Sequence, residues 1–397
     1  MAIYIGFDVH SQQTTYYAID QDQAVIRSGQ IETTAEAYSA FAGEMLKIDP
    51  VVEVAMETGT QCRWAALRLQ ENGLEARVFH ATEVAAYRPK KKQKNDLNDA
   101  KDMAHGLRNR LYRSEVYMPT DTESWMRKLC EERIGFVDIG TAEINKAKNI
   151  LRGKGLPVPG RLNTLKVWEN LLEQFRGSEL YFLLQLHYQT FRHAREMVNL
   201  LEEQIEKVRP ERKEEIELLE TIPCVGKLTA FALVAAIGDV QRFSDSTKIS
   251  SYFGVVPSSY DSGKRRTTGT HITRTGPSYV RRLLCECAHQ AMRSANPFSA
   301  YFYTVMRRSG NRKKAIVAVM HRIVRVAFQV LKTRQSFDAH KLRIFPELIG
   351  DNSRICWRMG VRPSGGEGAI PVPSIPEPPE KPLKIRKRKA SENGGNE

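Results

Sequence analysis

Residues 3–28 read IYIGFDVHSQQTTYYAIDQDQAVIRS. Three short runs in this stretch, 3–9, 14–20 and 23–28, are rich in Ile, Val, Tyr and Phe, and polar, turn-forming residues separate them. The pattern predicts three antiparallel strands joined by tight connections. An acidic residue, Asp8, lies near the end of the first run.

The alternation of elements continues along the chain after these strands. A helical pattern around 35–47 is followed by a buried-strand run at 51–56, a helix near 61–72, a strand at 75–80 and a helix from about 97 to 110. Three antiparallel strands followed by alternating helices and parallel strands is the element order of the RNase H-like fold. We therefore predict an α/β domain of this type over residues 1–118.

Acidic residues fall where these predicted elements end or begin: Asp8 on the first strand, Glu57 at the end of the fourth, and Asp96 and Asp99 at the start of the last helix. Carboxylate oxygens suit Mg²⁺ or Mn²⁺, and two such ions about 4 Å apart can clamp a phosphodiester. Taken alone, an Asp-x-x-Asp pair is more often an acidic first turn that caps a helix. A third acid, Asp102, follows Asp99 at the same three-residue interval, so the sequence leaves open which of these acids are the metal ligands. The set of four nevertheless favours a metal site.

The composition indicates the partner of such a site. The chain has 60 Lys and Arg residues against 46 Asp and Glu, a net charge of +14, which favours a polyanion. Hydrophobic residues make up 41% of the chain, which excludes a disordered basic protein.

Six cysteines without a CxxC pair indicate a reducing compartment, and exclude zinc ribbons. With no basic leader and no apolar run near 18 residues, we expect a soluble intracellular protein without a membrane partner.

A charged helical region is predicted for residues 119–212. Helical patterns cover 121–151 and 168–209, with a Gly- and Pro-rich loop at 153–161 between them. One apolar stripe on the second pattern comprises Met197, Leu201, Ile205 and Val208. Such a stripe needs a partner, so we expect a coiled coil, either as a hairpin or between protomers.

A mostly helical C-terminal domain is predicted for residues 213–340. The turn Ile222-Pro223-Cys224-Val225-Gly226 between two helical patterns predicts a helix-hairpin-helix-like element, whose backbone N–H groups could hold a phosphate. After about residue 340 the pattern of apolar residues expected for a buried core fades. Residues 341–397 are rich in Pro, Gly and Lys, and we expect a disordered tail there.

Ser262 lies in a Gly-bearing loop directly before Lys264, Arg265 and Arg266. On spacing alone this pattern favours a surface turn that contacts phosphate; the alternative is a nucleophilic serine whose cationic neighbours stabilise the developing charge. The residues expected to grip a nucleic-acid backbone are Lys90, Lys91, Lys92, Lys94, Lys264, Arg265, Arg266, Arg274, Arg281 and Arg282. His10, His80 and His271 show no ligand spacing, so we expect structural or substrate-contacting roles for them.

Several motifs together resemble a known family. They are IGFDVH, AMETG, KNDLNDAKD, IPCVGKLTAFALVAAIGDVQRF, SYFGVVPS and SGKRRTTGTHITRTGPSYVRRLL. Over roughly residues 3–332 the chain resembles the DEDD transposases of the insertion-sequence 110 family, including its 1111 subgroup and the Piv-type invertases. The resemblance implies a RuvC-like domain whose catalytic and metal-binding tetrad is Asp8, Glu57, Asp96 and Asp99, and a nucleophilic Ser262 in the C-terminal transposase domain.

The resemblance also implies partners that the composition does not show. These are the DNA of element ends and target, and an element-encoded guide RNA that pairs with both. Because Ser262 and the tetrad lie on different predicted domains, we expect a composite site assembled across the protomers of a homo-oligomer, dimer or tetramer. The expected location is the cytoplasm of a prokaryote, in association with the nucleoid. Cys224 departs from the family pattern, which usually has glycine there, and this puts a tight phosphate contact in doubt.

The expected function is therefore that of an RNA-guided DNA recombinase with Mg²⁺ or Mn²⁺ at the tetrad. Two alternatives stay open at this point. A metal-dependent junction nuclease would use water as the nucleophile, so that Ser262 only contacts phosphate. A nucleic-acid-binding protein with an inactive tetrad would show no divalent-dependent cleavage.

Overall fold

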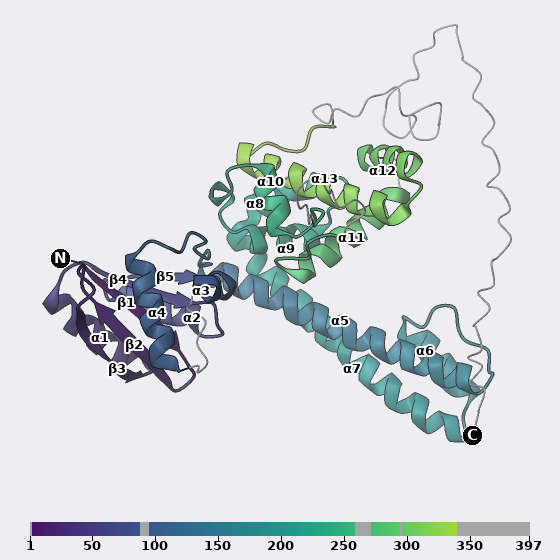
Figure 1. Cartoon of the computed structure of the whole chain (residues 1–397). Helices are drawn as coiled ribbons and strands as arrows, with labels where there is room; N and C mark the ends of the chain where they lie inside the picture. Colours follow the sequence, from purple (N-terminus) through teal and green to yellow (C-terminus); the bar gives the residue numbers. More distant parts are fainter. Residues whose placement is uncertain (1, 88–94, 259–270, 294–295, 340–397) are drawn as a thin grey trace, which may run out of the picture. The chain divides into compact units, whose positions relative to one another are not determined.

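The computed structural model describes residues 2–87, 95–258, 271–293 and 296–339 (Figure 1). The chain divides into two compact units, residues 1–120 and 121–397. Within the described ranges, no helix combines the length and the apolar character that a membrane span requires. Ser262, Lys264, Arg265, Arg266, the cations from Lys90 to Lys94 and the expected C-terminal tail lie outside these ranges.

The N-terminal unit is built on a five-stranded mixed sheet with the strand order β3-β2-β1-β4-β5. Its strands are β1 (Ile3–Val9), β2 (Gln13–Ile19), β3 (Val25–Glu32), β4 (Val52–Glu57) and β5 (Glu75–Phe79). β2 is antiparallel to both β1 and β3, whereas β1, β4 and β5 run parallel. This arrangement confirms the predicted order of elements along the chain and the predicted strand directions, and is consistent with a RuvC-like domain.

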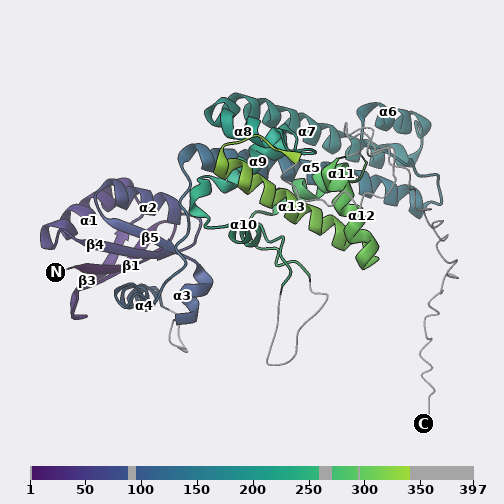
Figure 2. The ribbon, with the colours of Figure 1, turned by 90° about the horizontal axis from the view of Figure 1, so that it is seen from above.

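Helices cover both faces of the sheet (Figure 2). The side chains of Ile3, Ile5 and Phe7 point to one face and pack with α1 (Ala35–Ile48) and α2 (Cys62–Glu71). The intervening side chains, such as Tyr4, point to the other face, where α3 (Ala81–Tyr87) and α4 (Asp96–Arg108) lie. The sequence patterns did not predict α3, because its seven residues are too few to establish a helical period.

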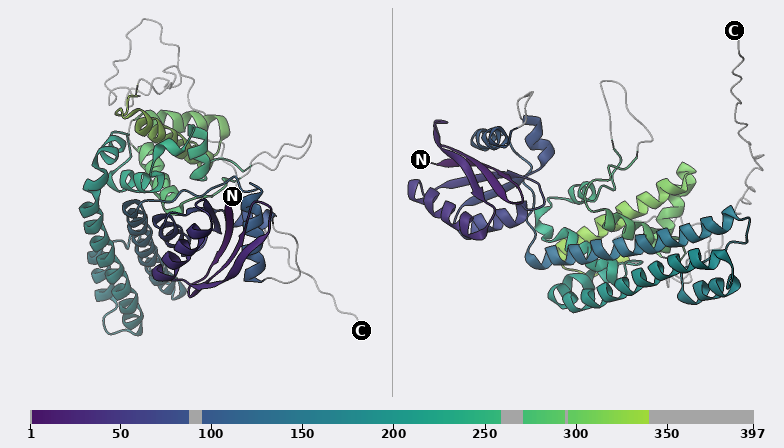
Figure 3. Two further views of the ribbon diagram at one scale, coloured as in Figure 1. Left: turned by 90° about the vertical axis from the view of Figure 1, so that its left-hand side faces the viewer. Right: turned by 90° about the horizontal axis from the view of Figure 1, so that it is seen from below.

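The C-terminal unit begins with a long antiparallel helical hairpin of α5 (Asp121–Gly153) and α7 (Glu179–Val208) (Figure 3). The short helix α6 (Leu165–Gln174) packs near the end of the hairpin, where the fully buried Trp168 stacks on Phe191 with ring centroids 5.5 Å apart. Of the predicted stripe on α7, Ile205 is buried and the other three residues are half-buried. The neighbouring helix of the hairpin is therefore one partner of this stripe.

The rest of the C-terminal unit is a helical core. It comprises η1 (Arg209–Arg212), α8 (Lys213–Glu220), α9 (Lys227–Ile237), η2 (Val240–Arg242), α10 (Ser246–Tyr252), α11 (Ser278–Arg293), α12 (Pro297–Ser309) and α13 (Arg312–Thr333). Every residue of α9 from Thr229 to Ile237 is buried, so this helix forms the centre of the unit.

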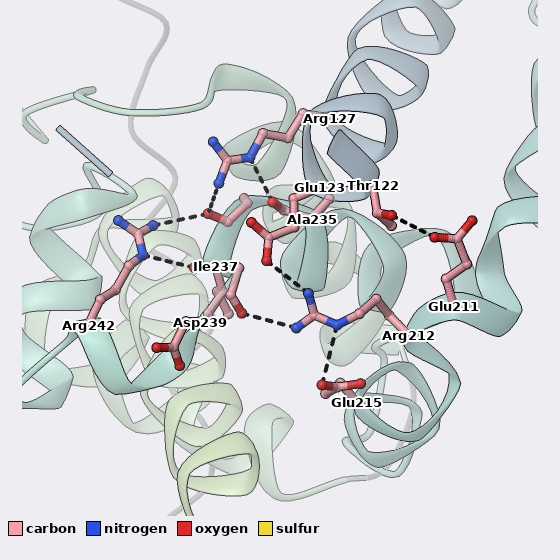
Figure 4. Close-up of polar contacts among 12 residues, drawn as sticks. Thr122, Glu123, Arg127, Glu211, Arg212, Glu215, Ala235, Ile237, Asp239 and Arg242 are labelled. Atoms are coloured by element: carbon pink, nitrogen blue, oxygen red, sulfur yellow. Dashed lines mark hydrogen bonds and ion pairs between the residues drawn. The ribbon is translucent and has the colours of Figure 1, made fainter. Parts of the chain in front are cut away.

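Arginines satisfy the carbonyl groups at the C-terminal end of α9 (Figure 4). Arg127 of α5 donates to the Ala235 carbonyl oxygen at 2.7 Å, and Arg242 donates to that of Ile237 at 2.9 Å. The last carbonyls of a helix have no intrahelical partner, and cations near them interact favourably with the helix dipole. The start of the long hairpin is thereby fixed to the central helix.

A second arginine network lies beside the first. Arg212 donates to the buried carboxylate of Glu123 at 2.9 Å, to Glu215 at 3.3 Å and to the Gly238 carbonyl oxygen at 3.1 Å (Figure 4). Because Glu123 lies on α5 and Glu215 on α8, one guanidinium connects the hairpin to the helical core. A buried carboxylate is tolerated in this position because it is paired and hydrogen-bonded.

Candidate functional site

The carboxyl ends of β1 and β4 bring Asp8 and Glu57 together. These strands are parallel neighbours, with Phe7 paired to Met56, so Asp8 and Glu57 occupy the next positions along each. Because side chains alternate along a strand, both acids point to the face that carries α4. Asp8 is only 7% exposed, and Glu57 is half-buried.

The start of α4 brings the other two acids to the same edge of the sheet. Asn95 caps the helix, its side chain accepting a hydrogen bond from the Leu97 N–H at 2.9 Å. Asp96 is the first helical residue, and Asp99 lies one turn on, buried against the sheet. The sequence prediction placed the helix start within one residue of Asp96.

His10 lies between two of the predicted metal ligands. Its Nε2 is 3.3 Å from Asp8 Oδ2 and 3.7 Å from Asp96 Oδ2. One ligand atom from each of these three residues lies within 4.8 Å of the others. This role of His10 was not predicted from the sequence, because the histidines were compared only with one another. The available signal was its spacing from Asp8, because residues two apart along a strand point to the same side.

The electrostatics of Asp8 reflect all four acids. Burial raises the pKa of Asp8, the nearby His10 lowers it, and the negative charges of Asp96, Asp99 and Glu57 raise it further. Clustered carboxylates repel one another unless a cation lies among them. Hard oxygen donors of this kind fit a divalent ion such as Mg²⁺ or Mn²⁺, and an imidazole suits the softer of the two.

Ser262 lies outside the described residues, but the residues that flank this gap are described. We call the flanking residues 254–258 and 271–276 the stem. The Ser258 N–H donates to the His271 carbonyl oxygen at 2.8 Å, and the Thr273 N–H donates to the Val256 carbonyl oxygen at 3.0 Å. Pro257 and Ile272 form the antiparallel bridge between these hydrogen bonds. The two ends of the serine-bearing segment are therefore held side by side.

Glycines and one arginine fix the base of this stem. Gly254 (φ +63°) and Gly276 (φ +67°) have left-handed backbones, and a Cβ on Gly276 would lie 1.9 Å from the Tyr252 carbonyl oxygen. Arg281 donates to the carbonyl oxygens of Thr275 and Gly276, the latter at 2.9 Å. This guanidinium, which the sequence suggested as a phosphate contact, is thus hydrogen-bonded to the stem.

The other two described cations of the predicted interface differ from each other. Arg282 pairs with Asp138 of α5 and lies 3.7 Å from Glu286. Arg274 is exposed and, at φ +57°, occupies a left-handed position in the stem. Of these two side chains, Arg274 is the one that presents its charge to solvent without an ion pair among the described residues.

The segment for which a helix-hairpin-helix-like element is predicted forms α8, a turn at 221–226, and α9. Cys224 takes φ +71°, a backbone region that favours glycine, and its Sγ lies 3.5 Å from the Asn296 side-chain nitrogen. A Cβ on Gly226 would meet nothing within 4 Å, so the backbone at the start of α9 is open. The cysteine therefore keeps the left-handed turn despite its side chain.

Comparison with known families identifies both units. The family model for IS110-type DEDD proteins, described as "Transposase", matches residues 5–155, which contain all four acids. A second model, described as "Transposase IS116/IS110/IS902 family", matches residues 216–304, which contain Ser262 and the stem. The chain belongs to the IS110 family of transposases. The two matches cover the N-terminal sheet and much of the helical core.

Individual relatives of this transposase agree with that assignment. The transposase for insertion sequence element IS1111A of Coxiella burnetii is 25% identical over 258 residues, 62% of this chain and 69% of the relative. A probable family 20 transposase of Pseudomonas aeruginosa is 25% identical over 300 residues, 73% and 84% of the two chains. The pilin gene-inverting protein of Moraxella bovis is 29% identical over 151 residues, 37% and 47% of the two chains.

Proposed function

We propose that this transposase cleaves and exchanges DNA strands as a site-specific recombinase of an insertion sequence. The observation that carries the proposal is the convergence of acids at one edge of the sheet, where Asp8 and Asp96 lie within ligand distance of His10 and the pKa of Asp8 responds to Glu57 and Asp99. The family membership supports DNA as the substrate. The protein would act on DNA in the cytoplasm of a prokaryote.

The tetrad of Asp8, Glu57, Asp96 and Asp99 would hold the divalent ion, Mg²⁺ or Mn²⁺. When bound, such an ion supplies positive charge that polarises a phosphodiester and orients it for attack. The carboxylates bind and position this charge, and α4 and the strand ends keep them in place. His10, 3.3 Å from Asp8, would hold that carboxylate in orientation through a hydrogen bond.

Ser262 would supply the nucleophile. Its Oγ would form a bond to phosphorus as its proton leaves, and the bond from phosphorus to one deoxyribose oxygen would break, leaving a hydroxyl end and a phosphoserine link. Lys264, Arg265 and Arg266 follow the serine and would neutralise the phosphate. A covalent link conserves the energy of the phosphodiester for strand exchange.

The decisive test is the covalent adduct. Wild-type protein, incubated with element-end DNA and Mn²⁺, is expected to leave a protein–DNA species that survives denaturing electrophoresis, whereas Ser262→Ala leaves none and still binds DNA. Ser39→Ala, a change on the exposed surface of α1, serves as the control and keeps the adduct. Cleavage without any adduct supports the junction nuclease instead, and absence of divalent-dependent cleavage supports an inactive binding protein.

An RNA guide and an oligomer complete the proposal. The family resemblance supports the guide RNA, and the oligomer is supported by the α5–α7 hairpin, which offers a long helical surface for a coiled coil between protomers. Protein expressed with its own flanking DNA is expected to copurify with one discrete RNA, because binding of a particular RNA shape selects one molecule whereas bulk charge does not. A heterogeneous mixture of cellular RNA, together with site-specific recombination by RNA-free protein, would contradict the guided mechanism.

A further inference from the structure

The segment from Cys287 to Phe337 is free of acidic residues. It carries ten Lys and Arg residues without a single Asp or Glu, although the chain as a whole has 46 acids. The segment includes α12 and α13, neither of which contributes to the tetrad or to the stem of the serine loop. Its excess positive charge therefore lacks an explanation in the proposed chemistry.

Half of these cations gather where α12 ends and α13 begins. Gly310 ends α12 in a left-handed conformation, and Asn311 caps α13, so the two helices are joined by a tight turn. We call the cations around it the basic turn: Arg307, Arg308, Arg312, Lys313 and Lys314. All five are exposed, and among the described residues none of them forms an ion pair with an acid.

The position of these cations on α13 is unfavourable for the protein alone. Arg312, Lys313 and Lys314 occupy the first turn of the helix, where the dipole favours acids and disfavours cations. Asn311 already satisfies the N–H groups of Lys313 and Lys314, at 3.0 and 3.2 Å, so the side-chain charges are not needed to cap the helix. An anionic partner is the interaction that would favour them.

The positive charge continues along one face of α13. Lys314, His321 and Arg325 are separated by seven and four residues, which places them on the same side of the helix. Burial lowers the pKa of His321, and the charges of Arg325 and Arg322 lower it further, so the imidazole favours its neutral form. The positive charge of this face therefore comes from the exposed Lys314 and Arg325. From Lys314 to Arg325 the face is about 16 Å long at 1.5 Å per residue.

We propose that the basic turn and this face of α13 bind the phosphate backbone of duplex DNA. The proposal rests on the proposed function, because family membership makes DNA the polyanion that this protein must hold. Exposed Lys and Arg side chains on a turn suit phosphates along a duplex rather than base edges, so the surface adds affinity without choosing sequence. At 3.4 Å per base pair, its length corresponds to about five base pairs.

The test measures how DNA affinity depends on salt. Fluorescence anisotropy is recorded with duplexes of two unrelated sequences, without divalent ions, for wild type, Lys313→Ala/Lys314→Ala and Arg307→Ala/Arg308→Ala. Each double variant is expected to weaken binding to both duplexes by the same factor, and to reduce the slope of log K against log salt by about 1 per side chain removed. Lys313→Ala/Lys314→Ala should also melt no lower than wild type, because it removes cations from a helix start.

The matched control removes two cations that already have partners. Lys128 lies 2.7 Å from Glu132, and Arg192 lies 3.4 Å from Glu196, both on the exposed surface of the hairpin. Lys128→Ala/Arg192→Ala changes the net charge equally and is expected to leave the salt slope as in wild type. Equal slopes for the control and the basic-turn variants would overturn the proposal.

Two further arms separate the alternatives. Loss of affinity for a structured RNA with unchanged duplex DNA binding would assign the surface to RNA and overturn the proposal. The same measurements on an Asp8→Asn background keep binding apart from catalysis. If the basic-turn variants change the salt slope but Ser262→Ala still forms the adduct, the serine mechanism is refuted and the basic turn remains a DNA contact. If the basic-turn variants leave the salt slope unchanged and Ser262→Ala forms no adduct, only the basic-turn proposal is refuted.

Discussion

Gly6 on β1 lies in direct contact with the backbone of α4 at Ala100. A Cβ built on Gly6 would lie 1.9 Å from the Ala100 carbonyl oxygen and 2.7 Å from the Ala104 nitrogen. Because only a hydrogen fits between strand and helix, α4 can approach β1 closely, and its first turn reaches the end of the strand. The glycine of IGFDVH thus determines how near Asp96 and Asp99 come to Asp8.

Gly6→Ala is expected to lower the free energy of unfolding of the N-terminal unit by about 1–3 kcal/mol, because the added methyl group must displace helix backbone. It should abolish recombination as well, since α4 carries two of the four acids. Denaturant unfolding and a recombination assay measure the two effects. Gly43→Ala on α1, where a Cβ meets nothing within 4 Å, is the control and should be neutral or stabilising. Wild-type stability of Gly6→Ala would contradict the close packing.

Asp8→Asn should remove metal binding without loss of fold. Burial and the neighbouring acids oppose ionisation of Asp8, so without metal the variant should melt at or above the temperature of wild type. Saturating Mn²⁺, at about 100 times its dissociation constant, should stabilise wild type by about 2.7 kcal/mol and leave Asp8→Asn unchanged. Thermal melting with and without Mn²⁺ measures this difference. Asp22→Asn, on an exposed turn, should behave as wild type.

The sheet and the positions of its acids could be predicted from sequence because they depend on local patterns. Short apolar runs and turn residues were sufficient to predict the order of elements along the chain, and Asp8 and Glu57 stood at predicted strand ends. The Asp96-x-x-Asp99 pattern marked the start of α4, which Asn95 caps in the structure. By contrast, the approach of His10 to Asp96 depends on how α4 crosses the sheet, which no local pattern records.

The C-terminal site was harder to predict for a physical reason. Ser262 stood out through family resemblance, since its local sequence equally suits a surface turn. Arg281 was predicted to contact phosphate because it belongs to a cationic run, yet in the structure it donates hydrogen bonds to carbonyl groups of the stem. Whether an arginine faces solvent or backbone depends on loop geometry between residues that are distant in sequence.

Glu143 on α5 should make the hairpin sensitive to acid. Burial would raise the pKa of this carboxyl, but hydrogen bonds from Lys146 at 2.7 Å and His187 at 2.5 Å outweigh it and lower the pKa below 4.5. A lowered pKa means that the stabilisation is present above pH 4.5 and lost as the pH falls through the folded-state value.

Glu143→Gln is therefore expected to lower the free energy of unfolding by about 1 kcal/mol at pH 7, and by less at pH 3, where wild type has lost the same interaction. Circular dichroism of thermal melts at the two pH values measures the change. Glu196→Gln removes an exposed partner of Arg192 on the same hairpin and should have almost no effect at either pH. An equal loss for Glu143→Gln at both pH values would show that its charge is unimportant.

Arg281 and Arg274 should have separable roles in the serine loop. Arg281→Lys is expected to form less adduct than wild type, although it keeps the positive charge. An ammonium group cannot reproduce the planar donors that contact the Thr275 and Gly276 carbonyl oxygens. Faster hydrogen exchange at the Thr273 amide, which donates across the stem to the Val256 carbonyl oxygen, would report that the base of the stem is loosened.

Arg274→Asn removes the charge but keeps a residue type that tolerates the left-handed backbone. It should lower the salt slope of DNA binding by about 1 and leave the exchange rate of the Thr273 amide unchanged. Full activity of Arg281→Lys would show instead that Arg281 acts as a phosphate contact, for which any cation suffices.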